Sequence, residues 1–173
     1  SPSDLSMVTK DDGWAVTQGG EYLHWNGQQW SIWSPKTGIS LELVDMADLD
    51  EGWAVSHDGR YFHWNGKIWS ESLPKPSFSA QAIDSVREGD LWAVGEGVMH
   101  WNGVAWITLD TDVQVPLLGI SMHDDTSGLI VGAKGARLSW STGVLAGPGV
   151  VTPPGTYVAV SVIDEYNAWA AGP

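Results

Sequence analysis

The chain has 173 residues, of which 12 are tryptophan and none is cysteine, and it carries a formal net charge of −13. This length fits one domain with a sizeable core, and the lack of cysteine excludes disulfides and thiolate metal sites. An acidic chain with only eight lysines and arginines lacks the basic face that nucleic acids and anionic membranes attract. No stretch is long enough for a membrane span, so we expect no membrane insertion. The chain opens Ser-Pro-Ser rather than with Met, which favours a processed, secreted protein or one unit of a longer chain.

A repeat of about 39 residues runs through the whole chain. The first three copies each contain a Trp-Ala-Val segment followed by His-Trp-Asn-Gly. The tryptophans of this segment are Trp14, Trp53 and Trp92, and Leu129 and Trp169 hold the same place in copies four and five. Such a fixed period indicates an array of one supersecondary unit.

Within each repeat, four short segments of alternating apolar and polar residues predict four antiparallel strands. Asn26-Gly27 and its two counterparts, 65–66 and 102–103, predict two-residue hairpins with positive φ at both central positions. Thr142-Gly143 is a weaker version of the same signal. The polar run His123-Asp124-Asp125 is interpreted as a loop.

Four strands in about 40 residues, repeated, predict an all-β fold, a β-propeller with four complete four-stranded blades and a C-terminal half-blade. We expect one domain over residues 1–173, with blades near 4–34, 41–72, 80–109 and 117–147 and the half-blade at 156–173. Only Ser1–Ser3 precede the first strand, too few to complete the half-blade, so its open edge is expected to pair with a neighbouring unit. The assembly edge comprises Trp169, Ala170, Ala171 and Gly172. An alternative is an arc of a larger propeller, which further repeats beyond Pro173 would establish.

The Trp-Ala-Val and His-Trp-Asn-Gly-x-x-Trp-Ser pattern resembles a propeller repeat of secreted and surface proteins of bacteria. It is also distantly similar to photosystem-II assembly-factor propellers and to the Asp-box repeats of sialidases. The resemblance implies a propeller whose hairpins pack their tryptophans. It implies no chemistry, because function resides in sites built on a fold.

No catalytic site is predicted, and we expect neither an enzyme nor a cofactor. His24, His63 and His100 recur once per blade, so we interpret them as packing or hydrogen-bonding positions rather than converging metal ligands. Asp45 and Asp84 are the weak metal candidates, since both fall at one aligned position of the first strand, which Ser6 and Ser121 share. The favoured interpretation of this position is hydrogen bonding to backbone or serine groups through ordered water. The three arginines, Arg60, Arg87 and Arg137, lie in different contexts and do not form a sialidase-like trio.

We therefore expect a non-catalytic structural module of an extracellular or cell-surface polymer or tandem-propeller protein. Its partners are other copies of itself or adjacent propeller units. The alternative is a carbohydrate- or protein-binding propeller, for which Trp33 is the candidate surface aromatic. Residues in Pro-containing contexts are candidates for O-linked sugars, namely Ser1, Ser34, Thr152 and Thr156.

Overall fold

The computed structural model describes residues 1–33, 38–72, 77–150, 155–164 and 167–173, with the backbone alone at 148–150. The chain divides into two compact units. Residues 1–79 with 87–89 form the first unit, and residues 80–86 with 90–173 form the second.

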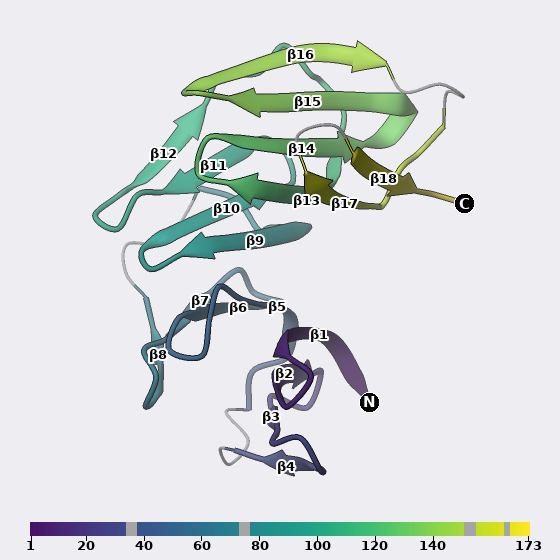
Figure 1. Ribbon diagram of the computed structural model, residues 1–173. Coiled ribbons are helices and arrows are strands. Elements are labelled where there is room, and N and C mark those ends of the chain that lie inside the picture. The colour runs from purple at the N-terminus through teal and green to yellow at the C-terminus, as the bar shows by residue number, and fades with distance from the viewer. Residues whose placement is uncertain (34–37, 73–76, 151–154, 165–166) are drawn as a thin grey trace. The chain divides into compact units, whose positions relative to one another are not determined.

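The first unit holds two four-stranded antiparallel sheets, blades 1 and 2, whose strands follow one another in chain order (Figure 1). Blade 1 consists of β1 (Pro2–Thr9), β2 (Asp12–Thr17), β3 (Tyr22–Trp25) and β4 (Trp30–Ile32). Blade 2 consists of β5 (Leu41–Met46), β6 (Gly52–Ser56), β7 (Tyr61–Trp64) and β8 (Trp69–Glu71).

The second unit holds blades 3 and 4 and a two-stranded half-blade (Figure 1). Blade 3 consists of β9 (Ala82–Arg87), β10 (Asp90–Val94), β11 (Val98–Trp101) and β12 (Trp106–Leu109). Blade 4 consists of β13 (Leu117–Asp124), β14 (Ser127–Gly132), a short 3-10 turn (Ala133–Gly135), β15 (Ala136–Ser141) and β16 (Val144–Val150). The half-blade pairs β17 (Ala159–Asp164) with β18 (Asn167–Ala171).

Four four-stranded sheets and one two-stranded sheet confirm the predicted strand content and repeat count. The core of each unit lies where one blade packs on the next. In the first unit, Trp14 of β2 is 1% exposed and packs with Val44, Met46 and Trp64 of blade 2. In the second unit, Trp92 of β10 is fully buried in a cluster with Ile120 and other side chains of blade 4. Trp14 and Trp92 thus each pack one blade on the next within their own unit.

The prediction of two-residue Asn-Gly hairpins was wrong. Trp25 pairs with Trp30, so four residues connect β3 to β4, and positive φ occurs at Gly27 but not at Asn26. The Asn26 side-chain oxygen instead accepts hydrogen bonds from the backbone N–H groups of Gln28 and Gln29, at 3.1 and 3.0 Å. This side-chain turn removes the need for a left-handed asparagine.

The weaker signal in blade 4 marks a genuine two-residue hairpin. Ser141 pairs with Val144, and Thr142 and Gly143 between them have φ values of 46° and 88°. The predicted loop over His123–Asp125 was wrong for its first two residues. His123 and Asp124 are the last residues of β13, and Asp124 pairs with Ser127 across a two-residue turn.

Candidate functional site: the half-blade and its groove

The half-blade exposes a tryptophan that its counterparts bury. Trp169 is 73% exposed, whereas the tryptophans at the same repeat position are 0–2% exposed. These buried counterparts are Trp14, Trp53 and Trp92. Trp169 pairs with Ser161 across β17 and β18, in the register that pairs Trp14 with Ser6 across β1 and β2. The difference in exposure therefore comes from missing neighbours and not from a different strand register.

Two layers cover Trp14 and Trp92. The first is the histidine opposite it on the third strand, with ring centroids 4.6 Å apart for Trp14 and His24 and 4.2 Å apart for Trp92 and His100. The second is a tryptophan from the third strand of the following blade, at 4.7 Å. Within the described residues, the sheet of β17 and β18 has two strands, so Trp169 has no third-strand histidine from its own sheet, and its 73% exposure shows that no tryptophan layer covers it either.

A groove of about 710 Å³ lies beside the half-blade. One wall is made by β14 and β15 of blade 4, and the other by β17 and β18, where Val162 and Asn167 contribute. On the blade 4 wall, Leu129 and Ser139 pair at the repeat positions held elsewhere by tryptophan and histidine. These smaller side chains leave space where the other blades are filled by aromatic rings.

The groove is lined by acidic and basic side chains and by both hydrogen-bond donors and acceptors. Asp124, Arg137 and Asp164 line it, and the amide of Asn167 donates to both oxygens of Asp164 at 2.8 and 2.9 Å. Hydrogen bonds from Thr126 lower the pKa of Asp124 to about 2, so this carboxylate is charged at neutral pH. Acceptors and donors in such a mixture suit the main chain and polar side chains of an extended polypeptide.

The first strands of consecutive blades are joined by a repeated hydrogen bond. The hydroxyl of Ser6 accepts from the backbone N–H of Met46, at 3.1 Å. The same bond links Asp84 to Met122 at 2.8 Å and Ser121 to Val162 at 3.0 Å. In each pair the acceptor is at the aligned Ser/Asp position, and the donor lies one residue after that position in the following sheet.

This arrangement places both weak metal candidates in structural hydrogen bonds. Asp45 accepts from the hydroxyl of Ser6 at 3.1 Å, and Asp84 accepts from a backbone N–H of the next blade. Among the described residues, no group of three or more His, Cys, Asp or Glu side chains has the arrangement of a metal site. The aligned Ser/Asp position therefore connects first strands.

The repeated histidines occupy equivalent hydrogen-bonded positions. The Nε2 atoms of His24, His63 and His100 lie 2.8–2.9 Å from a carboxylate oxygen two residues before the blade's tryptophan. Those carboxylates belong to Asp12, Glu51 and Asp90. The sequence analysis did not assign these acids, although their fixed offset from Trp14, Trp53 and Trp92 was a usable signal. In the half-blade the acid is replaced by Asn167.

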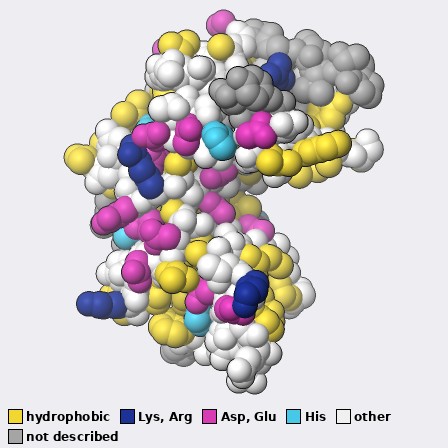
Figure 2. All heavy atoms as spheres, in the orientation of Figure 1, with side chains coloured by type: hydrophobic (Ala, Val, Ile, Leu, Met, Phe, Trp, Pro, Cys, Tyr) yellow, Lys and Arg dark blue, Asp and Glu magenta, His cyan; other side chains and the backbone are white. Residues whose placement is uncertain are grey.

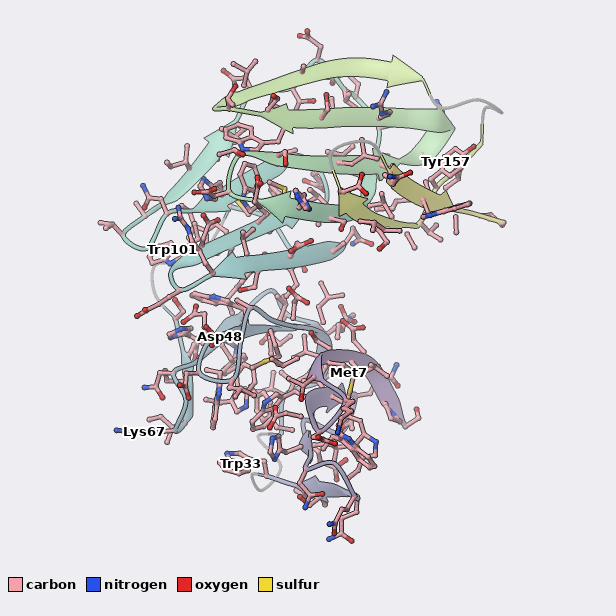
Figure 3. The ribbon with its side chains drawn as sticks, in the orientation of Figure 1. Met7, Trp33, Asp48, Lys67, Trp101 and Tyr157 are labelled. Carbon is pink, nitrogen blue, oxygen red and sulfur yellow. The ribbon has the colours of Figure 1, made fainter. Side chains whose placement is uncertain are left out.

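The remaining predicted site residues are scattered. Trp33 is 48% exposed and packs edge-on against Trp14 and Trp64, with centroids 5.4 and 5.5 Å away, so it is partly a packing residue (Figure 3). Ser1 is exposed and Thr156 is partly exposed, whereas Ser34 and Thr152 lie outside the described residues. Arg60 forms an ion pair with Asp58 at 2.7 Å.

The other residues of the assembly edge follow Trp169 at the end of β18. Ala170 is partly exposed, and Ala171 and Gly172 are exposed. A Cβ at Gly172 would lie 1.9 Å from the carbonyl oxygen of Thr156, so only glycine fits where the chain leaves the half-blade.

Comparison with known proteins shows what this arrangement resembles. No protein-family model and no curated protein matches the chain. Solved structures do match. A YCF48 protein bound to a D1 peptide is 17% identical with a TM-score of 0.72, over 98% of this chain and 61% of that one. Virginiamycin B lyase from Staphylococcus aureus is 13% identical with a TM-score of 0.78, over 98% and 62%.

The WD40 repeats of RRP9 are similar to the same extent, at 12% identity and a TM-score of 0.77, over 96% of this chain and 58% of theirs. The chain is a β-propeller protein. It spans about 60% of the length of these structures. These structures include a lyase, a peptide-bound protein and WD40 repeats, so the similarity establishes the fold alone. No helix in the described part of the chain is long and apolar enough to cross a membrane.

Proposed function

We propose that this propeller chain is a non-catalytic structural module of an extracellular or cell-surface polymer or tandem-propeller protein, and that its half-blade joins neighbouring units. The observation that carries the proposal is the exposure of Trp169, 73% against 0–2% at its three tryptophan counterparts. A flat indole left in water beside an incomplete sheet is a surface that gains free energy when another chain covers it.

The strand edge supports the same function. Antiparallel edges present unpaired backbone donors and acceptors that recruit another strand. Beside the edge of β18, the groove of about 710 Å³ has room for a polypeptide segment along blade 4. The half-blade therefore offers a partner both backbone pairing and side-chain burial.

The surface charge suits subunits that associate through a specific contact. Figure 2 shows acidic side chains distributed over the visible face, with few basic ones among them, in keeping with the net charge of −13. Such a surface keeps subunits soluble until a specific contact forms. The resemblance of the repeats to those of secreted bacterial propellers favours an extracellular or cell-surface location. Ser1 and Thr156 are the described candidates for O-linked sugars.

A second candidate function is a protein- or peptide-binding propeller that uses the same groove. The mixture of Leu129, Arg137 and Asn167 in its walls favours a peptide over a purely apolar ligand. The similar fold of a YCF48 protein bound to a D1 peptide supports this candidate. A carbohydrate ligand would instead use Trp33, which keeps about half of its surface exposed.

Hydrogen exchange at increasing protein concentration tests the leading proposal. We expect the backbone amides of residues 167–171 to exchange more slowly as concentration rises, because a neighbouring unit covers β18. The substitution Trp169→Ser should abolish this change, whereas Val104→Ser, at an 80% exposed position of blade 3, should not. Amides that exchange equally fast at every concentration would refute assembly through the half-blade.

A further inference from the structure

The contact between consecutive blades has two chemically distinct sides. The leading side is the tryptophan of the second strand, such as Trp14 in blade 1 or Trp92 in blade 3. The receiving side belongs to the next blade and has three components. Two lie on its first strand, an aliphatic residue and the residue two positions after it, and the third is a tryptophan on its third strand. In blade 2 these are Val44, Met46 and Trp64, exposed by 3%, 7% and 3%. In blade 4 they are Ile120, Met122 and Trp140, and the first two are 7% and 9% exposed.

Blade 1 carries a receiving side that no described residue covers. Leu5 and Met7 occupy the positions of Val44 and Met46, yet they are 57% and 44% exposed (Met7 is labelled in Figure 3). Trp25, the counterpart of Trp64, is only partly buried. The residue types on this face match those of the covered receiving sides.

The open receiving side already has the conformation of the covered ones. The indole N–H of Trp25 donates to the carbonyl of Lys10 at 3.1 Å. Trp64 and Trp140 make the same bond, also to a carbonyl 15 residues earlier, at 3.0 and 3.1 Å. The orientation of the Trp25 ring is therefore fixed before any partner arrives, which reduces the entropy that binding must overcome.

Met7 is set in place in the same way. Its sulfur lies against Gly13, so close that a Cβ on that glycine would be 2.4 Å away. The sulfurs of Met46 and Met122 lie against Gly52 and Gly128 in the same way, each 2.2 Å from an added Cβ, although both methionines are buried by a preceding blade. The exposed methionine thus keeps the position of its covered counterparts.

The half-blade carries the complementary leading side. Trp169 holds the place of Trp14 and Trp92 and is 73% exposed. Ser161 holds the aligned Ser/Asp position, whose members Ser6, Asp84 and Ser121 each accept a backbone N–H from the following sheet. Ser161 is itself exposed. Its missing donor corresponds, by the same register, to the backbone N–H of Met7.

We propose that the half-blade of one copy packs on blade 1 of a second copy in the manner of consecutive blades, with Trp169 covering Trp25 and Ser161 accepting a hydrogen bond from the backbone N–H of Met7. This inference rests on the proposed function, and it names the partner surface. One chain bears both sides of one interface, at opposite ends of its sequence. A contact between unlike faces repeats from copy to copy and builds a chain of molecules.

Disulfide trapping tests this pairing directly, because the chain has no cysteine of its own. A side chain that accepts from the partner's backbone N–H brings the two Cα atoms within the roughly 4.4–6.8 Å that a disulfide requires. Copies carrying Ser161→Cys are mixed with copies carrying Met7→Cys under mild oxidation. We expect a covalent pair that contains one copy of each kind. Thr108→Cys, at an exposed position of β12, replaces Met7→Cys in the control mixture and should yield no such pair.

A second variant tests the aromatic contact without cysteine chemistry. Trp25→Leu should weaken self-association roughly 100-fold, because it removes the surface that Trp169 covers. Sedimentation of the same samples separates the outcomes. If copies associate and Trp169→Ser abolishes this association, but neither trapping nor the Trp25→Leu effect is seen, the blade 1 pairing is wrong and assembly through the half-blade stands. If copies stay monomeric, both the blade 1 pairing and assembly through the half-blade are wrong. A chain carrying both cysteines that cross-links only internally overturns the pairing between copies.

Discussion

Replacing equivalent tryptophans in two repeats should have very different effects on the monomer. Trp92 is fully buried, stacks on His100 at 4.2 Å and contacts Trp140 at 4.7 Å. Its replacement by alanine removes about 150–250 Å² of buried contact surface and should cost about 3–5 kcal/mol of unfolding free energy. Trp169 is 73% exposed. Only about 50 Å² of it is buried within the chain, so Trp169→Ala should cost about 1 kcal/mol.

Urea unfolding followed by far-UV circular dichroism measures both losses, at a concentration where each variant is monomeric. Trp92→Phe is a milder companion variant in case Trp92→Ala does not fold, and it should still lose more stability than Trp169→Ala. Equal losses at the two positions would refute the reasoning. They would mean that Trp169 is buried by its own chain and is not available to contact a partner.

Three further changes test the internal contacts. Glu51→Ala should cost about 2–4 kcal/mol of unfolding free energy, because it removes the acceptor of the indole N–H of Trp53 (3.0 Å) and of Nε2 of His63 (2.8 Å). Glu51→Gln should cost less, and thermal melts of both variants measure the difference. Asn102→Ala removes an acceptor for two backbone N–H groups and should cost about 1 kcal/mol in the same assay. The carboxyl of Asp124 should titrate near pH 2 by NMR, so its contribution to stability is present above its unfolded pKa of 3.8 and is lost as pH falls toward 2.

The repeated tryptophans made the architecture predictable from sequence. Their spacing set the number of sheets, and the incomplete fifth copy located the half-blade. Turn geometry was less predictable. Asn26 carries the dipeptide signal of a two-residue hairpin, yet its side chain forms a turn with Gln28 and Gln29 that makes the loop longer. Local sequence does not show which of two side-chain conformations the surrounding strands select.

The candidate site was only partly predictable, because its parts are far apart in sequence. Trp169 could be singled out because it holds the repeat position of Trp14, Trp53 and Trp92. The groove depends on Leu129 and Ser139 being smaller than their counterparts, and on residues of the half-blade such as Asn167 lining the same space. Hydrogen bonding at the aligned Ser6 position was expected through water, whereas the structure shows its hydroxyl accepting directly from Met46 in the next blade.

The most direct test of assembly through the half-blade is the mass of the wild-type chain in solution, measured by sedimentation over a wide concentration range. The exposed Trp169 and the open edge of β18 predict masses that rise with concentration in multiples of 18.7 kDa. They also predict that Trp169→Ser remains at the mass of one chain. A wild-type chain that stays monomeric at the highest concentration would contradict the account.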